Sequence, residues 1–143
     1  MSADPHSAAV TPRAWAEDGL ARKRGRVQMF NATRPDGLDG WTIAVEQYEL
    51  LVDVILTTID GFAADDGTVP LQVIVNEAQA RLGSHPAFPN GRLSNYVRYT
   101  KVDLEARGLV QRVPKSSPQR VRRTPTKPSD PYESQSGGRR SSP

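Results

Sequence analysis

Apolar residues recur at helical spacing in three stretches of the chain. The first begins near Val45 and stops at Asp60-Gly61, with apolar positions at Tyr48, Leu51, Val52, Ile55 and Ile59. The second runs from Leu71 to Leu82 and meets Gly83 as a C-cap, while Pro70 before it suits a first helical position. The third places Leu93, Val97, Thr100 and Leu104 on one stripe. These spacings predict three amphipathic helices around one core.

A β-hairpin is predicted directly after the third helix. The helix should end near Arg107, because Gly108 can take the left-handed conformation that follows many helices. Residues 109–113 are rich in β-formers, Pro114 to Pro118 has turn chemistry, and 119–123 returns as a second strand. A helix, a glycine and a basic hairpin are typical of a recognition helix followed by a wing.

Two short strands are predicted before the first helix. Val27–Asn31 has β-like alternation, and Trp41–Ile43 is its expected partner, with Asp39-Gly40 as a turn. The fold class expected is therefore α+β: a winged helix of three helices followed by a β-hairpin wing, with short N-terminal strands and disordered termini.

The 143 residues are enough for one small domain with loose ends. Residues 1–25 read as a disordered leader with a basic end, although Trp15 and Leu20 leave a short docking helix as an alternative. Residues 26–123 should form the domain. Residues 124–143 are rich in Pro, Ser and Arg and should be a disordered tail.

Charge is distributed unevenly along the chain. Residues 92–123 carry nine Lys and Arg against two acidic residues, whereas residues 27–91 carry two Arg against nine acidic residues. A cationic surface of this kind attracts polyanions, while the acidic remainder orients their approach.

Catalytic and metal-binding patterns are not recognisable in the sequence. There are no cysteines, and the two histidines, His6 and His85, belong to no ligand or triad spacing. No phosphate-binding glycine loop or nucleophile elbow occurs. We therefore expect no enzyme activity, no cofactor and no small-molecule substrate. No signal peptide or apolar run long enough for a membrane span is visible, so we expect a cytoplasmic protein without a membrane partner.

Three segments resemble a known family. They are Arg26 followed by VQMFN at 27–31, VEQYE at 45–49, and KVDLEARGLVQR at 101–112 with PQRVR at 118–122. They are similar to a family of small bacterial domains of unknown function, over about residues 26–123. The helix, glycine and basic strand are also similar to winged helix-turn-helix proteins at large. The resemblance implies a fold rather than an activity.

Double-stranded DNA is the partner that these patterns favour, bound by a transcription regulator or nucleoid-associated protein. The face of the third helix opposite its buried stripe would read base edges, and the wing would contact phosphates. The candidate residues are Arg92, Asn95, Arg98, Tyr99, Lys101, Arg112, Lys115, Arg120, Arg122 and Arg123.

A protein-interaction module is the alternative. In that case the acidic first half, or an exposed region around Trp41 and Phe88, would contact a protein partner or a second copy of the chain. A contiguous apolar patch on the first helix would favour this alternative. A basic face formed jointly by the third helix and the wing would favour nucleic acid.

Overall fold

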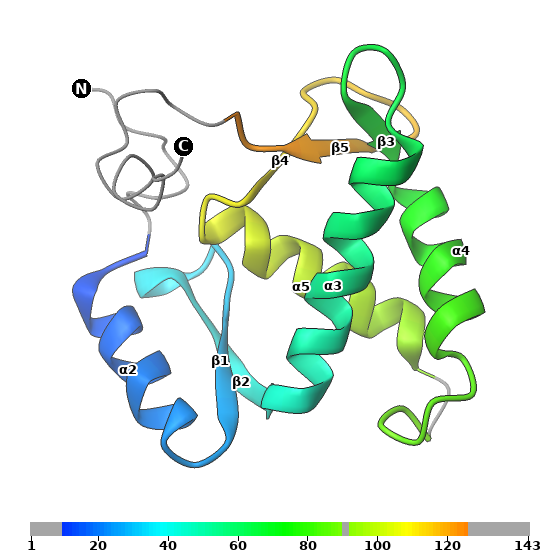
Figure 1. The fold of residues 1–143 in the computed structure, drawn as a ribbon. Helices are drawn as coiled ribbons and strands as arrows, with labels where there is room; N and C mark the ends of the chain where they lie inside the picture. Colours follow the sequence, from blue (N-terminus) through cyan, green and yellow to red (C-terminus); the bar gives the residue numbers. More distant parts are fainter. Residues whose placement is uncertain (1–9, 90–91, 126–143) are drawn as a thin grey trace, which may run out of the picture.

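The computed structural model describes residues 10–89 and 92–125. Over these residues the chain is a mixed α+β protein with four α-helices and two small antiparallel sheets. In chain order (Figure 1) its elements are α2 (Pro12–Arg22), β1 (Arg26–Phe30), the 3-10 turn η1 (Pro35–Gly37), β2 (Leu38–Ala44), α3 (Val45–Phe62), β3 (Thr68–Pro70), α4 (Leu71–Leu82), α5 (Leu93–Ala106), β4 (Val110–Arg112) and β5 (Arg120–Arg123).

The three helices predicted from apolar spacing are confirmed as α3, α4 and α5, and they pack against one another. Their apolar stripes meet in a single core, because a helix that is apolar on one side must bury that side. On α5 the four stripe positions Leu93, Val97, Thr100 and Leu104 are at most 2% exposed. Gly108 ends this segment with a φ of 82°, the left-handed conformation predicted for it.

The predicted hairpin is present as β4 and β5, but it belongs to a larger sheet. The strand order is β3-β5-β4, with Val69 opposite Val121 and Gln111 opposite Arg122. Strand β3 was not predicted. Pro70, expected as the first residue of a helix, is instead the last residue of β3 and the N-cap of α4.

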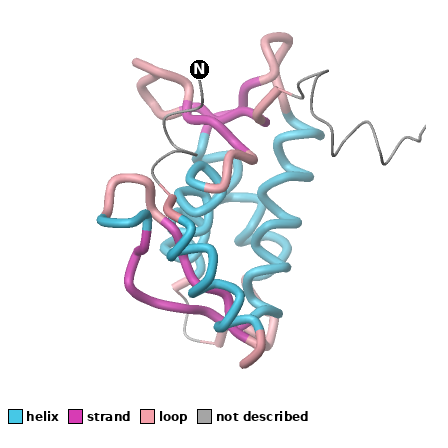
Figure 2. Tube along the Cα trace, turned by 90° about the vertical axis from the view of Figure 1, so that its left-hand side faces the viewer, coloured by secondary structure: helices cyan, strands magenta, loops and turns pink. Residues whose placement is uncertain are grey.

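The N-terminal strands are confirmed as an antiparallel hairpin, although its turn was misplaced. Val27 lies opposite Ile43, and the register shifts between Gln28 and Phe30. The residues expected to form the turn, Asp39 and Gly40, lie within β2 instead, and η1 makes the connection. Figure 2 shows this hairpin and the three-stranded sheet at opposite ends of the helices.

Part of the expected leader is helical. Residues 12–22 form α2, so the docking-helix alternative holds for this segment. The helix begins after Thr11, whose Oγ1 accepts a hydrogen bond from the Ala14 amide at 3.2 Å. It packs against β1 through buried positions that include Ala14 and Ala21. The expectations for residues 1–9 and 126–143 lie outside the described residues.

No helix in the described part of the chain is both long enough and apolar enough to cross a membrane.

Candidate functional site

The side of α5 opposite the core carries four of the candidate residues. Arg92, Asn95, Arg98 and Tyr99 are all exposed, and Tyr99 retains 48% of its accessible surface. The geometry follows from the helical period, because the residues between the buried stripe positions must point outward. We call these four residues the outer face of α5.

Lys101 does not lie on the outer face, which corrects our expectation. Its side chain is 6% exposed, and its Nζ donates to Glu105 Oε2 and to Gln119 Oε1, each at 2.7 Å. Lys101 is four residues after Val97 and three before Leu104, so helical spacing already places it beside the buried stripe. Paired and enclosed, it is not available to a phosphate.

The five candidate residues of the hairpin divide into two groups. Arg112 and Lys115 are exposed. Arg120 is half-buried, and its Nε donates to Thr68 Oγ1 at 2.8 Å across the sheet. The remaining two are also engaged: Arg122 Nε donates to Gln111 Oε1 at 2.9 Å, and Arg123 pairs with Asp60 at 2.7 Å. The cations best placed to contact a ligand are therefore Arg112 and Lys115.

A pocket of about 610 Å³ lies between the N-terminal hairpin and the outer face of α5. Its lining combines aromatic, cationic, amide and acidic side chains. They are Asn31, Arg34, Asp39, Trp41, Arg92, Asn95, Tyr96 and Tyr99. Sequence reasoning missed this pocket because its two walls come from distant segments, although aromatic residues three apart at 96 and 99 were a signal on one wall.

Three aromatic rings meet in the pocket. Trp41 makes an edge-to-face contact with Tyr99 at a centroid distance of 5.3 Å, and it lies 6.4 Å from Tyr96. The Trp41 Nε1 donates to Asp39 Oδ2 at 2.8 Å, which fixes the orientation of the indole. The pocket therefore has a defined aromatic wall with hydrogen-bonding groups around it.

The region proposed for a protein partner, around Trp41 and Phe88, is not an exposed apolar surface. Phe88 is 5% exposed and packs in the core, where its ring lies 5.8 Å from that of Tyr96. Trp41 is half-buried against the tyrosines of α5. On α3, the large apolar residue that is exposed among those described is Phe62, near the end of the helix.

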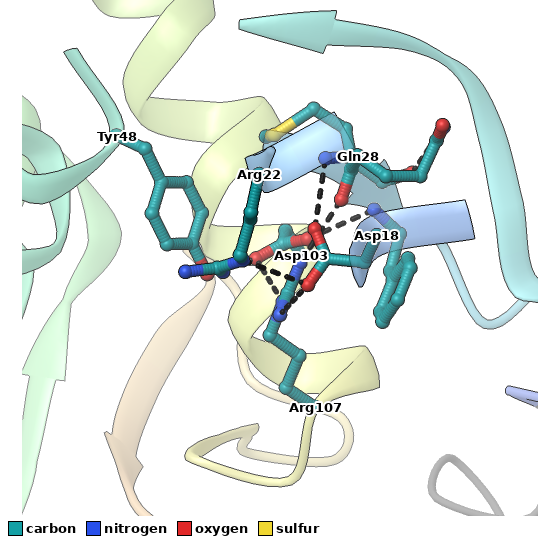
Figure 3. Close-up of polar contacts among 8 residues, drawn as sticks. Asp18, Arg22, Gln28, Tyr48, Asp103 and Arg107 are labelled. Atoms are coloured by element: carbon teal, nitrogen blue, oxygen red, sulfur yellow. Dashed lines mark hydrogen bonds and ion pairs between the residues drawn. The ribbon is translucent and has the colours of Figure 1, made fainter. Parts of the chain in front are cut away.

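A buried polar network joins the C-terminal end of α5 to the N-terminal elements (Figure 3). Arg107 donates to Asp103 Oδ2 at 2.9 Å, to Asp18 Oδ2 at 3.2 Å and to the carbonyl of Gln28 at 2.9 Å. The Tyr48 hydroxyl donates to Asp103 Oδ2 at 2.6 Å. The Tyr48 hydroxyl therefore faces a buried carboxylate and not water.

Burial sets the protonation behaviour of this network. Burial is the largest influence on Asp103 and raises its pKa, although Arg107 acts in the opposite direction. The pKa of the Tyr48 hydroxyl is raised first by burial and then by the negative charge of Asp103. The side chains of Asp18, Asp103 and Arg107 are at most 7% exposed, so a substrate has no access to them. The network therefore links α5 to α2 and β1 in the interior of the protein.

Residues 26–121 match DUF6958, a family of unknown function. The chain belongs to this family. The DUF6958 segment begins at β1 and ends within β5, so it contains the pocket, the outer face of α5 and most of the buried network. Asp18 and the rest of α2 precede it. The chain matches no curated protein and no solved structure.

Within the described residues, no group of three or more His, Asp or Glu side chains could hold a metal ion. The side chains of the pocket and of the outer face offer aromatic rings, hydrogen-bonding groups and charge.

Proposed function

We propose that this protein is a winged-helix module that binds double-stranded DNA. The order of its elements supports the fold: α3, β3, α4 and α5 are followed by the β4–β5 hairpin, and the strands are arranged β3-β5-β4. In this reading α4 and α5 form the helix-turn-helix pair, α5 is the recognition helix, and the β4–β5 hairpin is the wing.

The outer face of α5 carries side chains suited to the edges of bases. Arg98 can donate two hydrogen bonds to guanine, and Asn95 can pair with adenine in the major groove. Tyr99 adds an apolar surface that can contact a thymine methyl group. None of these three side chains is hydrogen-bonded to another described residue.

The wing and the start of α5 carry cations that can contact phosphates. Arg92, Arg112 and Lys115 are exposed, and none forms an ion pair within the described residues. Contacts to phosphates orient a protein on the duplex without reading its sequence. Arg122 is half-buried and could contribute a weaker contact.

The observation that carries the proposal is the division of α5 into two faces. Leu93, Val97 and Leu104 are buried in the core, while Asn95 and Arg98 are directed outward and are exposed. A recognition helix needs this division, because the core must hold the helix firmly while its other side enters the groove.

Titration of a fluorescent random duplex with the full chain at several salt concentrations tests the proposal. Four cations contacting phosphates give a slope of about −4 in a plot of log affinity against log salt. Binding in the micromolar range that weakens along this slope supports duplex recognition. A flat salt response, or no binding at low salt, excludes it.

A further inference from the structure

We infer that the pocket between the N-terminal hairpin and α5 binds a single unpaired nucleotide. Its base would stack on the exposed ring of Tyr99 with an edge against Trp41, and its phosphate would lie against Arg34 and Arg92. The inference goes beyond duplex binding, because a duplex presents base edges and phosphates but keeps the faces of its bases stacked inside. It depends on the pocket alone.

The aromatic wall is suited to a flat ring. Tyr99 is 48% exposed, and its edge-to-face contact with Trp41 at 5.3 Å leaves ring surface accessible in the pocket. The hydrogen bond from Trp41 Nε1 to Asp39 fixes one ring before any ligand arrives. Proteins that bind unpaired nucleotides use such rings, because stacking is available to any base.

The charge of the pocket suits one phosphate group. The charged side chains that line it are Arg34, Arg92 and Asp39. Arg34 Nε lies 4.0 Å from Asp39 Oδ1, so Asp39 offsets one of the two positive charges. One uncompensated guanidinium charge remains, and a guanidinium binds phosphate oxygens through paired hydrogen bonds.

Two amides supply the groups that pair with a base edge. Asn95 projects from α5 and makes no hydrogen bond to another described residue. Asn31 accepts hydrogen bonds through Oδ1 from the Thr33 amide at 3.0 Å and the Thr33 hydroxyl at 2.6 Å, which leaves its Nδ2 as a donor. An aromatic wall, an amide pair and a cation together match the base and phosphate of a nucleotide. The volume of about 610 Å³ lies in the usual range for small-molecule sites.

Trp41 provides the signal for a direct test. The chain has two tryptophans, so a Trp15→Phe background leaves Trp41 as the single reporter. The full chain is titrated with adenosine monophosphate, with adenosine, with inorganic phosphate, and with a single-stranded oligonucleotide. We expect saturable quenching by the monophosphate, with adenosine and phosphate each binding at least tenfold more weakly, on the order expected for losing stacking or a charged hydrogen bond.

The oligonucleotide distinguishes the two sources of the nucleotide. Tighter binding by the strand than by the monophosphate identifies an unpaired nucleotide of a nucleic acid as the ligand. Tighter binding by the monophosphate identifies a free nucleotide. Equal binding by adenosine and its monophosphate, or no saturable quenching up to about 1 mM of any nucleotide, overturns the inference. Benzoate, an aromatic anion without a phosphate, is the control ligand. Tighter binding of benzoate than of the monophosphate would also overturn the inference.

Variants of pocket residues test whether the quenching of Trp41 fluorescence comes from binding in the pocket. Tyr99→Ala and Arg34→Gln should each weaken binding of the monophosphate by roughly tenfold. Both side chains are exposed, so the fold should persist, and circular dichroism checks it. Lys23→Ala is the matched control, because Lys23 is an exposed cation outside the pocket. Equal losses in all three variants would overturn the inference. Arg34 lines the pocket and is not assigned to the duplex, so loss of nucleotide binding in Arg34→Gln with retained salt-dependent duplex binding would leave the proposed function intact.

Discussion

Arg107, at the end of α5, donates a hydrogen bond to Asp18 in α2 at 3.2 Å, although the two residues are 89 positions apart in the chain. The same guanidinium lies 4.2 Å from the centre of the Phe30 ring in β1. One side chain therefore joins α5 to both α2 and β1. Since β1 pairs with β2, this link also fixes the wall of the pocket that carries Trp41 relative to α5.

Replacing Arg107 should destabilise the whole chain. Arg107→Met leaves the carboxylate of Asp103 buried without a cation and removes one of the two cations that pair with Asp18, and breaking a buried pair in this way costs about 3–5 kcal/mol. Urea unfolding followed by circular dichroism measures the change in the free energy of unfolding. A loss below about 1 kcal/mol would contradict the role assigned to the network.

Arg22 provides the matched control for Arg107. It pairs with the same carboxylate, Asp18 Oδ2, at 3.0 Å, but its side chain is 44% exposed. Asp18 is buried, but water screens the largely exposed guanidinium of Arg22, so we expect this pair to contribute less than about 1 kcal/mol. Arg22→Ala should therefore change the free energy of unfolding very little, whereas Arg107→Met should lower it clearly under the same conditions.

Tyr48 should make stability decrease at alkaline pH. Its folded-state pKa is raised by burial and by Asp103, so the folded protein keeps a proton that the unfolded chain releases above pH about 10. The free energy of unfolding therefore falls, by up to about 1.4 kcal/mol per pH unit above that point, and the contribution is fully present below it.

Tyr48→Phe tests this pH dependence. At neutral pH the variant should be less stable by about 1–3 kcal/mol, because Asp103 loses a hydrogen-bond donor. Above pH about 10 the difference in the free energy of unfolding between the wild type and the variant should shrink, since phenylalanine has no proton to lose. Urea unfolding at several pH values gives both curves. Curves that stay parallel into the alkaline range would refute the prediction.

Gly108 should tolerate alanine poorly. Its φ is 82°, and an L-residue in this conformation costs about 1–2 kcal/mol. Gly61 is the control, since it lies in α3 and an added Cβ would meet nothing within 4 Å. Gly61→Ala should therefore stabilise the chain, by up to about 1 kcal/mol. The thermal midpoint should therefore fall in Gly108→Ala and rise in Gly61→Ala. An unchanged midpoint in Gly108→Ala would contradict the role of this turn.

The helices were predictable because the apolar residues that anchor each helix recur at regular spacing within one short segment. The second predicted helix has the same bounds as α4, and the stripe of α5 is buried at the predicted positions. Strand β3 was not predictable in this way. It has three residues, and its pairing with β5 depends on a segment far along the chain. Propensity and spacing carry no signal for such a partner.

Helix α2 was predicted only as the alternative to a disordered leader, and the pocket was missed, for a related reason. Helix α2 lacks a strong apolar stripe and is held by Asp18, which accepts a hydrogen bond from the Gln28 amide and contacts Arg107. The pocket joins Trp41 of β2 to Tyr99 of α5. Such contacts follow from tertiary packing, so the sequence could indicate the outer face of α5 but not the wall opposite it.

The hairpin cations provide the sharpest test of duplex binding, and the structure changes which of them to replace. Arg120 and Arg122 are candidates in the second strand of the hairpin, but Arg120 donates a hydrogen bond to Thr68 across the sheet, so its loss would also weaken the fold. Arg112→Gln with Lys115→Asn removes two exposed charges instead. Asparagine suits position 115, where φ is 61°.

This double variant should bind all duplex sequences more weakly, and its salt slope should be shallower by about 2. Arg98→Ala should behave differently, because a contact to a base edge contributes about 1–3 kcal/mol of discrimination at one base pair. Selection from a random duplex library should therefore show a relaxed preference in Arg98→Ala and an unchanged preference in the double variant. If both variants lose affinity equally for every sequence, α5 contacts only the phosphate backbone. If neither loses affinity, the duplex does not lie on this side of the protein.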